Sequence, residues 1–208
     1  MIFRDRAEAA HLLAEALIEY RGEHPLVLAI PRGAVPMGRI IAEALLGELD
    51  VVLVRKVGAP GNPELAVGAV DETGQLYIND GAAMLHVSQD YLEEERRTQA
   101  ETLRRRRQLY TVARPPIDPA GRVVIVVDDG VATGASMAAA LRAVRAKNPT
   151  KLVAATAVAP PPVVRMLKAV ADDVVILQIP HSFHAVGQFF EEFPQVSDEA
   201  VIAMLATS

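Results

Sequence analysis

The stretch from Val123 to Ser136 constrains the fold of this chain more than any other. It opens with five consecutive β-branched residues, continues with two acids, and becomes a loop of small residues before a helix predicted from Met137 to about Lys147. An uninterrupted apolar run is typical of a strand that is buried on both faces, as in a parallel sheet. The stretch therefore predicts an α/β protein whose ligand binds beyond the carboxyl end of this strand.

The residues after this predicted strand suit a group that has a phosphate at one end and a diol at the other. Backbone N–H groups at a helix N-terminus bind anions, and small loop residues let a phosphate approach them closely. Thr133 and Ser136 add hydroxyl donors, whereas Asp128 and Asp129 would repel a phosphate and accept hydrogen bonds from two hydroxyl groups. The pattern therefore predicts a ribose 5-phosphate site. We expect both acids to be largely solvated before a ligand binds.

The same stretch resembles the phosphoribosyl-diphosphate (PRPP) motif of the type I phosphoribosyltransferases, in which apolar residues precede two acids and a T-G-x-S/T loop. The resemblance implies that Asp128 and Asp129 hold the ribose hydroxyls of PRPP. It also implies that the 5-phosphate is wrapped by the loop residues Ala132, Thr133, Gly134, Ala135 and Ser136. The alternative is an ordinary turn in which the acids cap the helix, but capping needs only one acid. The chain lacks the Gly-Lys-Ser/Thr of a P-loop and the G-x-G-x-x-G of a nucleotide-binding βαβ unit.

Composition and charge limit the other classes of protein. The 208 residues fit one domain, and 51% apolar residues with 4% aromatics predict a core of Val, Leu, Ile and Ala. A net charge of -5 argues against a nucleic-acid-binding protein, because such proteins carry a basic patch. The absence of cysteine excludes a disulfide framework and a thiolate zinc site. Because no signal sequence or apolar run of ~20 residues is found, we expect a cytoplasmic protein without membrane contacts.

The rest of the chain alternates between strand and helix patterns. Apolar strands are expected at 26–30, 51–54, 152–158 and 174–179, and helices at 5–21, 35–46, 162–170 and 198–206. A hairpin is expected from 64–70 and 75–78, and a polar helix capped by Ser88 from 89 to about 113. The predicted fold is a parallel sheet with helices on both faces, in a single domain over 1–208. It carries an insertion at about 57–118 and a C-terminal hood at about 180–208, and the whole pattern resembles phosphoribosyltransferase-like proteins with a long helical insertion.

The turn after the first predicted strand supplies a second phosphate-binding candidate. Arg32, Gly33 and Ala34 follow Pro31 at a strand end. They resemble the family's diphosphate-binding loop, in which backbone amides around an Arg-Gly pair contact diphosphate through an unusual cis peptide. The resemblance implies that these three residues bind the diphosphate of PRPP. An ordinary turn between a strand and a helix is the alternative.

Arg55 and Lys56 follow the predicted strand 51–54 and precede a stretch rich in Gly and Pro. They resemble the Arg-Lys pair before the mobile loop of adenine-type family members, which implies a catalytic role on the leaving diphosphate. A solvated strand end is the alternative. Residues 57–80 would then form a lid that excludes water from the oxocarbenium-like charge of the reaction.

Magnesium is the expected cofactor of such a reaction. Mg²⁺ prefers phosphate oxygens and a few waters to an all-protein cage, so we expect it to bind through PRPP and not directly through protein side chains. His181 and His184 could be read as a metal pair, but no acidic residue is adjacent to them.

The segment after the last predicted strand is the candidate acceptor site. It holds four of the five Phe residues, and it resembles the C-terminal segment of uracil-type family members. Phe183 and His184 are the expected contacts of a planar base, although each Phe could instead cover the sheet edge. Ala132 stands where hypoxanthine-guanine members carry an acid, so the proton acceptor must come from elsewhere. Candidates are Glu64, Asp71, Glu72 and His184, and the sequence does not name the acceptor.

Three functions remain open at this stage. The leading one is an enzyme that transfers phosphoribose from PRPP to a small nitrogenous base. The second is a regulatory module that binds PRPP without catalysis, and the third is a hydrolase or phosphatase that holds a metal on Asp128 and Asp129.

The run Arg104 to Arg107 shares its predicted helix with several acids. We therefore expect this helix to be solvated or to bridge two subunits of a homodimer, and we do not expect it to bind nucleic acid.

Overall fold

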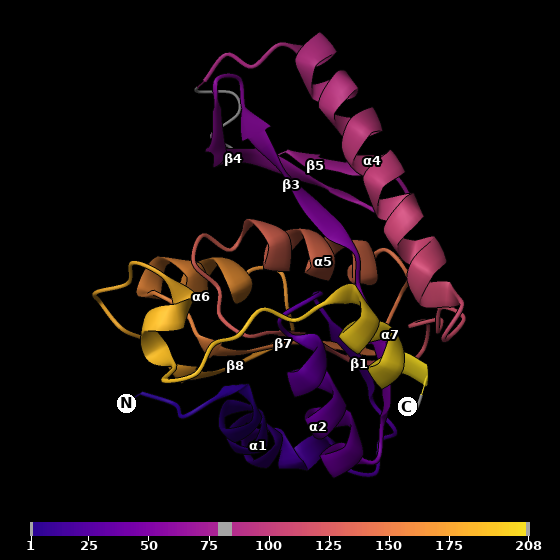
Figure 1. Cartoon of the computed structure of the whole chain (residues 1–208), viewed down its shortest axis with the longest axis vertical. Coiled ribbons are helices and arrows are strands. Elements are labelled where there is room, and N and C mark those ends of the chain that lie inside the picture. Colours follow the sequence, from indigo (N-terminus) through magenta and orange to yellow (C-terminus); the bar gives the residue numbers. More distant parts are fainter. Residues whose placement is uncertain (1, 79–84, 207–208) are drawn as a thin grey trace.

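A five-stranded parallel sheet forms the centre of the protein (Figure 1). The computed structural model describes residues 2–78 and 85–206. The strand order is β2-β1-β6-β7-β8, and all four pairings are parallel. The strands are β1 (Leu26–Ala29), β2 (Glu48–Val51), β6 (Val123–Asp128), β7 (Lys151–Val158) and β8 (Asp173–Gln178). This arrangement confirms the predicted fold class.

Helices cover both faces of this sheet (Figure 1). One face carries α1 (Arg6–Ala16), the short 3-10 helix η1 (Ile18–Tyr20) and α2 (Val35–Leu45), and the other carries α5 (Ala135–Arg145) and α6 (Pro161–Leu167). Alternate residues of β6 pack into two separate buried clusters. Ile125 and Val127 lie in the cluster of the α1 and α2 side chains, whereas Val126 lies in that of α5 and α6. Burial on both faces is the reason for the apolar run in the sequence.

The predicted strand 51–54 is wrong in its position. The core strand β2 ends at Val51, and β3 (Val54–Ala59) begins after a two-residue crossing. The error has a physical cause in Asp50, a β2 residue that is only 2% exposed. In a sequence, an aspartate beside an apolar run indicates that the buried strand does not include it. Asp50 is nevertheless inside the strand because it is paired with Arg107, which lies 57 positions further along the chain.

A second, antiparallel sheet stands over α5 (Figure 1). It consists of β3, β4 (Asn62–Asp71) and β5 (Leu76–Ile78), in that order. The predicted hairpin is confirmed, and its turn is closed by the Asp71 carboxylate, which accepts hydrogen bonds from the backbone N–H groups of Thr73 (2.9 Å) and Gln75 (3.0 Å). Gly74 has a φ of 87°, which favours glycine. The helix α4 (Gln89–Thr111) covers the face of this sheet opposite α5.

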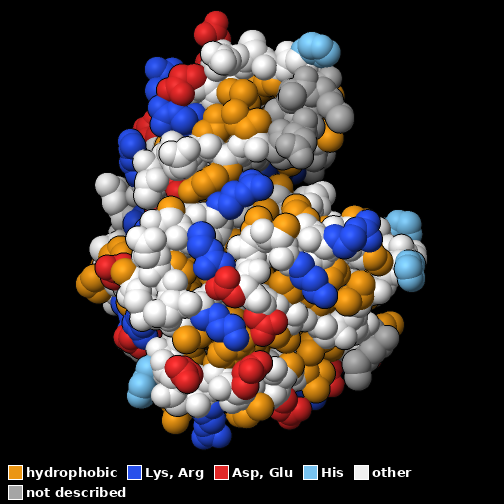
Figure 2. Space-filling view, turned by 180° about the vertical axis from the view of Figure 1, so that it is seen from behind, with side chains coloured by type: hydrophobic (Ala, Val, Ile, Leu, Met, Phe, Trp, Pro, Cys, Tyr) orange, Lys and Arg blue, Asp and Glu red, His pale blue; other side chains and the backbone are white. Residues whose placement is uncertain are grey.

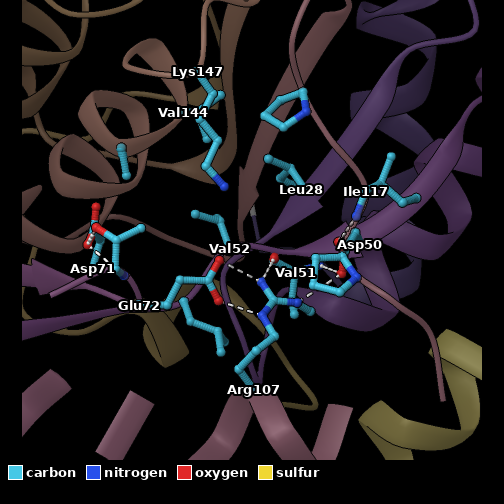
Figure 3. Close-up of a pocket in the computed structure, with 15 residues that line it drawn as sticks. Leu28, Asp50, Val51, Val52, Asp71, Glu72, Arg107, Ile117, Val144 and Lys147 are labelled. Atoms are coloured by element: carbon cyan, nitrogen blue, oxygen red, sulfur yellow. Dashed lines mark hydrogen bonds and ion pairs between the residues drawn. The ribbon is translucent and has the colours of Figure 1, made fainter. Parts of the chain in front are cut away.

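The helix α4 is fastened to the core through a buried arginine (Figure 3). The side chain of Arg107 is 13% exposed, and its Nη2 donates to the Val51 carbonyl (2.8 Å) and to Glu72 Oε1 (3.0 Å). Its Nη1 lies 3.3 Å from Asp50 Oδ1. The expectation of a solvated arginine run is therefore wrong for Arg107, whereas Arg105 is 76% exposed and pairs with Glu101 one turn before it.

The C-terminal segment returns across the carboxyl edge of the parallel sheet (Figure 1). It contains the 3-10 helix η2 (Val186–Phe189) and α7 (Asp198–Ala206). The backbone of the buried residue Phe3 binds this segment twice, because its N–H donates to the Phe189 carbonyl and its carbonyl accepts from the Glu191 N–H, both at 2.8 Å. Within residues 2–78 and 85–206, no helix has the combination of length and apolar character that crossing a bilayer requires.

Candidate functional site

The predicted site segments follow neighbouring strands of the parallel sheet. The segment after β1 and the segment after β6 lie side by side, because the Ile30 N–H donates to the Val127 carbonyl at 2.9 Å. The segment after β6 also contacts the end of β7, where the Val131 N–H donates to the Val158 carbonyl at 2.8 Å. The carboxyl ends of β1, β6, β7 and β8 therefore form one edge, which is where ligands bind in open α/β sheets.

The predicted phosphate loop ends in a helix start that requires glycine. Gly134 precedes α5 and has a φ of 82°, and a Cβ atom there would lie 1.9 Å from Met166 Cε. Ala132 and Thr133 are exposed, and Ala135 and Ser136 are half-buried in the first turn of α5. The N–H groups of a first helical turn have no partner within the helix, so they are available to an anion.

Asp129 is held by an arginine from the first helix. Arg6 Nε donates to Asp129 Oδ2 at 2.9 Å, and these side chains are 11% and 13% exposed. Arg6 Nη1 also donates to the Pro194 carbonyl at 2.6 Å, and its guanidinium carbon lies 3.7 Å from the centre of the Phe193 ring. Sequence analysis missed Arg6, because a polar first residue of a helix carries no local signal of a partner 123 positions away.

Asp128 has fewer partners than Asp129. Its Oδ1 accepts a hydrogen bond from the Asp129 N–H at 2.9 Å. Burial, together with the negative charge of Asp129, raises the pKa of the Asp128 carboxyl well above its ordinary value. Burial also raises the pKa of Asp129, against the opposing effect of the Arg6 guanidinium. The expectation of solvated acids is therefore wrong, because α1 and the C-terminal segment cover this strand end.

The predicted diphosphate loop lies directly against Asp129. The Pro31–Arg32 peptide bond is cis, as the family resemblance implies. A Cβ atom on Gly33 would lie 2.2 Å from Asp129 Oδ2, so only glycine fits there. Arg32 Nη1 is 3.3 Å from Asp198 Oδ2 of α7, and Ala34 is fully buried. The loop is thus placed between the acid pair and the C-terminal segment.

Arg55 and Lys56 are not brought together as predicted. They lie inside β3, where their cross-strand partners are Val70 and Ala69. Successive strand residues face opposite sides of a sheet. Val70 packs in the cluster that includes the α4 side chains, whereas Ala69 lines a cavity of about 210 Å³ shared with α5 and Thr133. Lys56 is therefore on the face toward the phosphate loop and Arg55 on the face toward α4.

Phe183 and His184 lie beside the phosphate loop. With His181 they line an open hollow of about 630 Å³ whose other walls are Ala132, Thr133, residues 160–162 and Arg165. The loop that carries them is fixed by Gln188, whose Oε1 accepts hydrogen bonds from the backbone N–H groups of His184 (3.0 Å) and Ala185 (3.2 Å). The Phe183 ring packs on the ring of Phe189, with 5.3 Å between the centroids.

Two candidate proton acceptors have structural partners instead. Glu72 is paired with Arg107, and Asp71 is 4% exposed and accepts a hydrogen bond from the Tyr77 hydroxyl at 2.9 Å. Burial and this contact with Asp71 raise the pKa of Tyr77. The side chain of Glu64 lies outside the described residues. Within the described part of the chain, no three His, Asp or Glu side chains gather as a metal site.

Comparison with known proteins agrees with this geometry. The family defined as "Phosphoribosyl transferase domain" matches residues 3–189. Two curated proteins from strains of Mycobacterium tuberculosis, provisionally named as phosphoribosyl transferases, are 39% identical over 205 residues, which is 98% of this chain and 46% of theirs. The chain thus spans about half the length of these relatives. The crystal structure of the protein TT1426 from Thermus thermophilus is 50% identical, with a TM-score of 0.88 over 100% of this chain and 99% of that chain. The chain belongs to the phosphoribosyl transferase domain family.

Proposed function

We propose that this protein transfers the 5-phosphoribosyl group of PRPP to a nitrogenous base, with release of diphosphate. The observation that carries this proposal is the contact between the two predicted PRPP-binding segments. Gly33 of the diphosphate loop has room for no Cβ atom, because Asp129 of the acid pair fills that space. Two motifs separated by about a hundred positions therefore form one continuous surface, on which the diphosphate and the ribose hydroxyls of one PRPP molecule would bind side by side.

Each segment has a part in the proposed reaction. The acid pair accepts hydrogen bonds from the ribose hydroxyls, the loop 132–136 binds the 5-phosphate with its N–H groups and hydroxyls, and residues 32–34 bind the diphosphate. The bond between ribose C1 and the diphosphate oxygen breaks and its electron pair leaves with diphosphate, while the acceptor nitrogen forms the new bond to C1. We assign to Lys56, on the face of β3 toward the phosphate loop, the stabilisation of the negative charge that grows on the leaving group.

Magnesium fits this site as an ion held mainly by the substrate. The protein offers two neighbouring carboxylates, Asp128 and Asp129, which is fewer than an all-protein oxygen cage needs. When bound through PRPP, Mg²⁺ would neutralise part of the charge on the diphosphate. The carboxylates of the acid pair then orient the ribose, and the loop amides hold the 5-phosphate.

A regulatory module that binds PRPP without turnover is the second candidate. It is favoured by one observation: the predicted catalytic pair Arg55 and Lys56 is divided between two faces of β3. The site also lacks a carboxylate at Ala132. Leu109 near the end of α4 is 52% exposed, and Val112, which follows the helix, is 88% exposed. A homodimer that covers both residues is part of the proposal for either function. Light scattering tests that state.

Release of diphosphate separates the two candidates. The full chain is incubated with PRPP, Mg²⁺ and each member of a panel of purines, pyrimidines and small amines, and PRPP affinity is measured by calorimetry in parallel. The transferase predicts diphosphate release that depends on one class of acceptor. Tight PRPP binding without release from any acceptor would establish the module instead, and no PRPP binding would overturn both.

A further inference from the structure

The hollow beside the phosphate loop has an unusual charge. Arg165, on the last turn of α6, lines it and has no hydrogen-bond or ion-pair partner among the described residues. By contrast, the arginines on the other side of the acid pair are neutralised, Arg6 by Asp129 and Arg32 by Asp198. His181 and His184 line the same hollow, and none of its described lining residues is an acid.

The surface of the molecule shows the same distribution. In Figure 2, His side chains and Lys or Arg side chains lie near one another at one side of the molecule, just below a notch. Arg165 is exposed at this hollow, where its guanidinium is available to an anionic group of a ligand. The guanidinium of arginine matches a carboxylate by two parallel N–H···O bonds.

The remaining walls of the hollow suit a flat ring. One side of the Phe183 ring is packed on Phe189, and the residue is half-buried at the wall of the hollow. Pro160, Pro161 and Pro162 also line the hollow, and they carry no backbone N–H donor. Aromatic rings stack well on such apolar surfaces. The Gln188 side chain accepts a hydrogen bond from the His184 N–H and so fixes the loop that carries Phe183 and His184.

We propose that the acceptor of this transferase is a planar nitrogen heterocycle that bears a carboxylate, and that Arg165 binds this carboxylate. The inference rests on the proposed transferase function and specifies its substrate class. An acceptor of this kind carries a negative charge of its own. The site does not supply one at position 132, because Ala132 has no acidic or basic group. Its ring nitrogen attacks ribose C1, and diphosphate leaves with the electron pair of the broken C1–O bond. A reacting nitrogen that carries a hydrogen, as in orotate, loses that proton to water, whereas a pyridine nitrogen, as in nicotinate, has none to lose.

The test uses compounds that differ by one carboxylate. Orotate is compared with uracil, and nicotinate with nicotinamide, in diphosphate release with saturating PRPP and Mg²⁺, using the full chain. The inference predicts that the carboxylated member of at least one pair is used at least tenfold better. Arg165→Met should reduce that preference by roughly tenfold to a hundredfold, the effect of one charge-assisted hydrogen-bonded contact, and should leave the use of the neutral member unchanged.

A matched variant and a binding measurement keep the result interpretable. Lys168→Met removes a cation three positions further along, outside the hollow, and should leave the preference intact. PRPP affinity of Arg165→Met should equal that of the parent. A loss of PRPP affinity would instead assign Arg165 to a phosphate of PRPP and overturn the inference. Equal or better use of the neutral compounds would also overturn it while the transferase stands. No diphosphate release with any compound would remove the transferase and the inference together.

Discussion

Two clusters of charged residues in this protein differ in how completely their groups are paired. At the junction of α4 with the core, Arg107 contacts Glu72, Asp50 and the Val51 carbonyl, so each charge has a partner (Figure 3). At the carboxyl end of β6, Asp129 is paired with Arg6, whereas the adjacent Asp128 has no ion-pair partner among the described residues, and burial raises the pKa of both. The comparison indicates that the paired cluster holds the fold together, whereas the underpaired cluster is arranged for a ligand.

The largest expected effect is on the paired cluster. Arg107→Met leaves Asp50 and Glu72 with uncompensated charges, and loss of one partner of a buried pair costs about 3–5 kcal/mol. We expect urea unfolding to show a loss of this size. The matched control is Arg105→Met, whose exposed pair with Glu101 contributes about 0.5 kcal/mol or less. Equal stability of the two variants would break the distinction.

Within β3, Lys56 and Arg55 face opposite sides of the strand, so only one of them faces the phosphate loop. Lys56→Met should lower kcat by about 10²–10³-fold, the effect of removing one preorganised electrostatic partner of a transition state. Arg55→Met changes the neighbouring residue on the opposite face and should leave kcat unchanged within error. Steady-state kinetics on both variants tests the register. An Arg55 effect as large as that of Lys56 would contradict it.

A smaller effect, of opposite sign, is expected at the underpaired cluster. Asp128→Asn removes a negative charge that no cation pairs among the described residues and keeps an oxygen that can accept the Asp129 N–H, so the free energy of unfolding at neutral pH should rise by about 1–3 kcal/mol. PRPP affinity should fall in the same variant, because a ligand that donates to the carboxylate loses an ionised acceptor. Thermal unfolding and calorimetry on the same sample report both. A destabilised variant would place Asp128 with the structural residues.

The smallest expected difference is in pH dependence. The folded-state pKa of Asp128 is raised above 3.8, so its contribution to the free energy of unfolding falls as pH rises from about 4 through the folded value, by up to ~1.4 kcal/mol per unit. Asp128→Asn should remove this fall. Asp173 is the control, because a hydrogen bond from the Tyr20 hydroxyl lowers its pKa. Its contribution is present above pH 4 and lost below, so Asp173→Asn should destabilise the protein only above about pH 4. If the free energy of unfolding changed with pH in the same way in both variants, the opposite pKa shifts assigned to Asp128 and Asp173 would be contradicted.

The sequence predicted those parts of the fold whose signals are local. The apolar run of β6, the glycine at position 134 and the hairpin around Gly74 each depend on residues within a few positions. The same holds for the order of motifs in the candidate site. These features could be predicted because burial on two faces and a positive φ each restrict residue type directly.

The parts that could not be predicted depend on distant partners. Arg6 meets Asp129 across 123 positions, and Asp50 meets Arg107 across 57. No local pattern distinguishes either arginine from a solvated one, and Arg165 gives no signal beyond its own charge. Because the strand before β3 was predicted to end at residue 54, Arg55 and Lys56 were expected together at a strand end. They lie instead within β3, where successive side chains face opposite sides of the sheet.

The most direct test of the account is PRPP binding by the double variant Asp128→Asn with Asp129→Asn. Calorimetric titration with PRPP and Mg²⁺ is paired with thermal unfolding of the same samples. We predict that the parent binds PRPP, and that the double variant does not bind it although its unfolding transition remains cooperative. PRPP affinity equal to that of the parent in a folded double variant would contradict the assignment of this acid pair to the ribose hydroxyls.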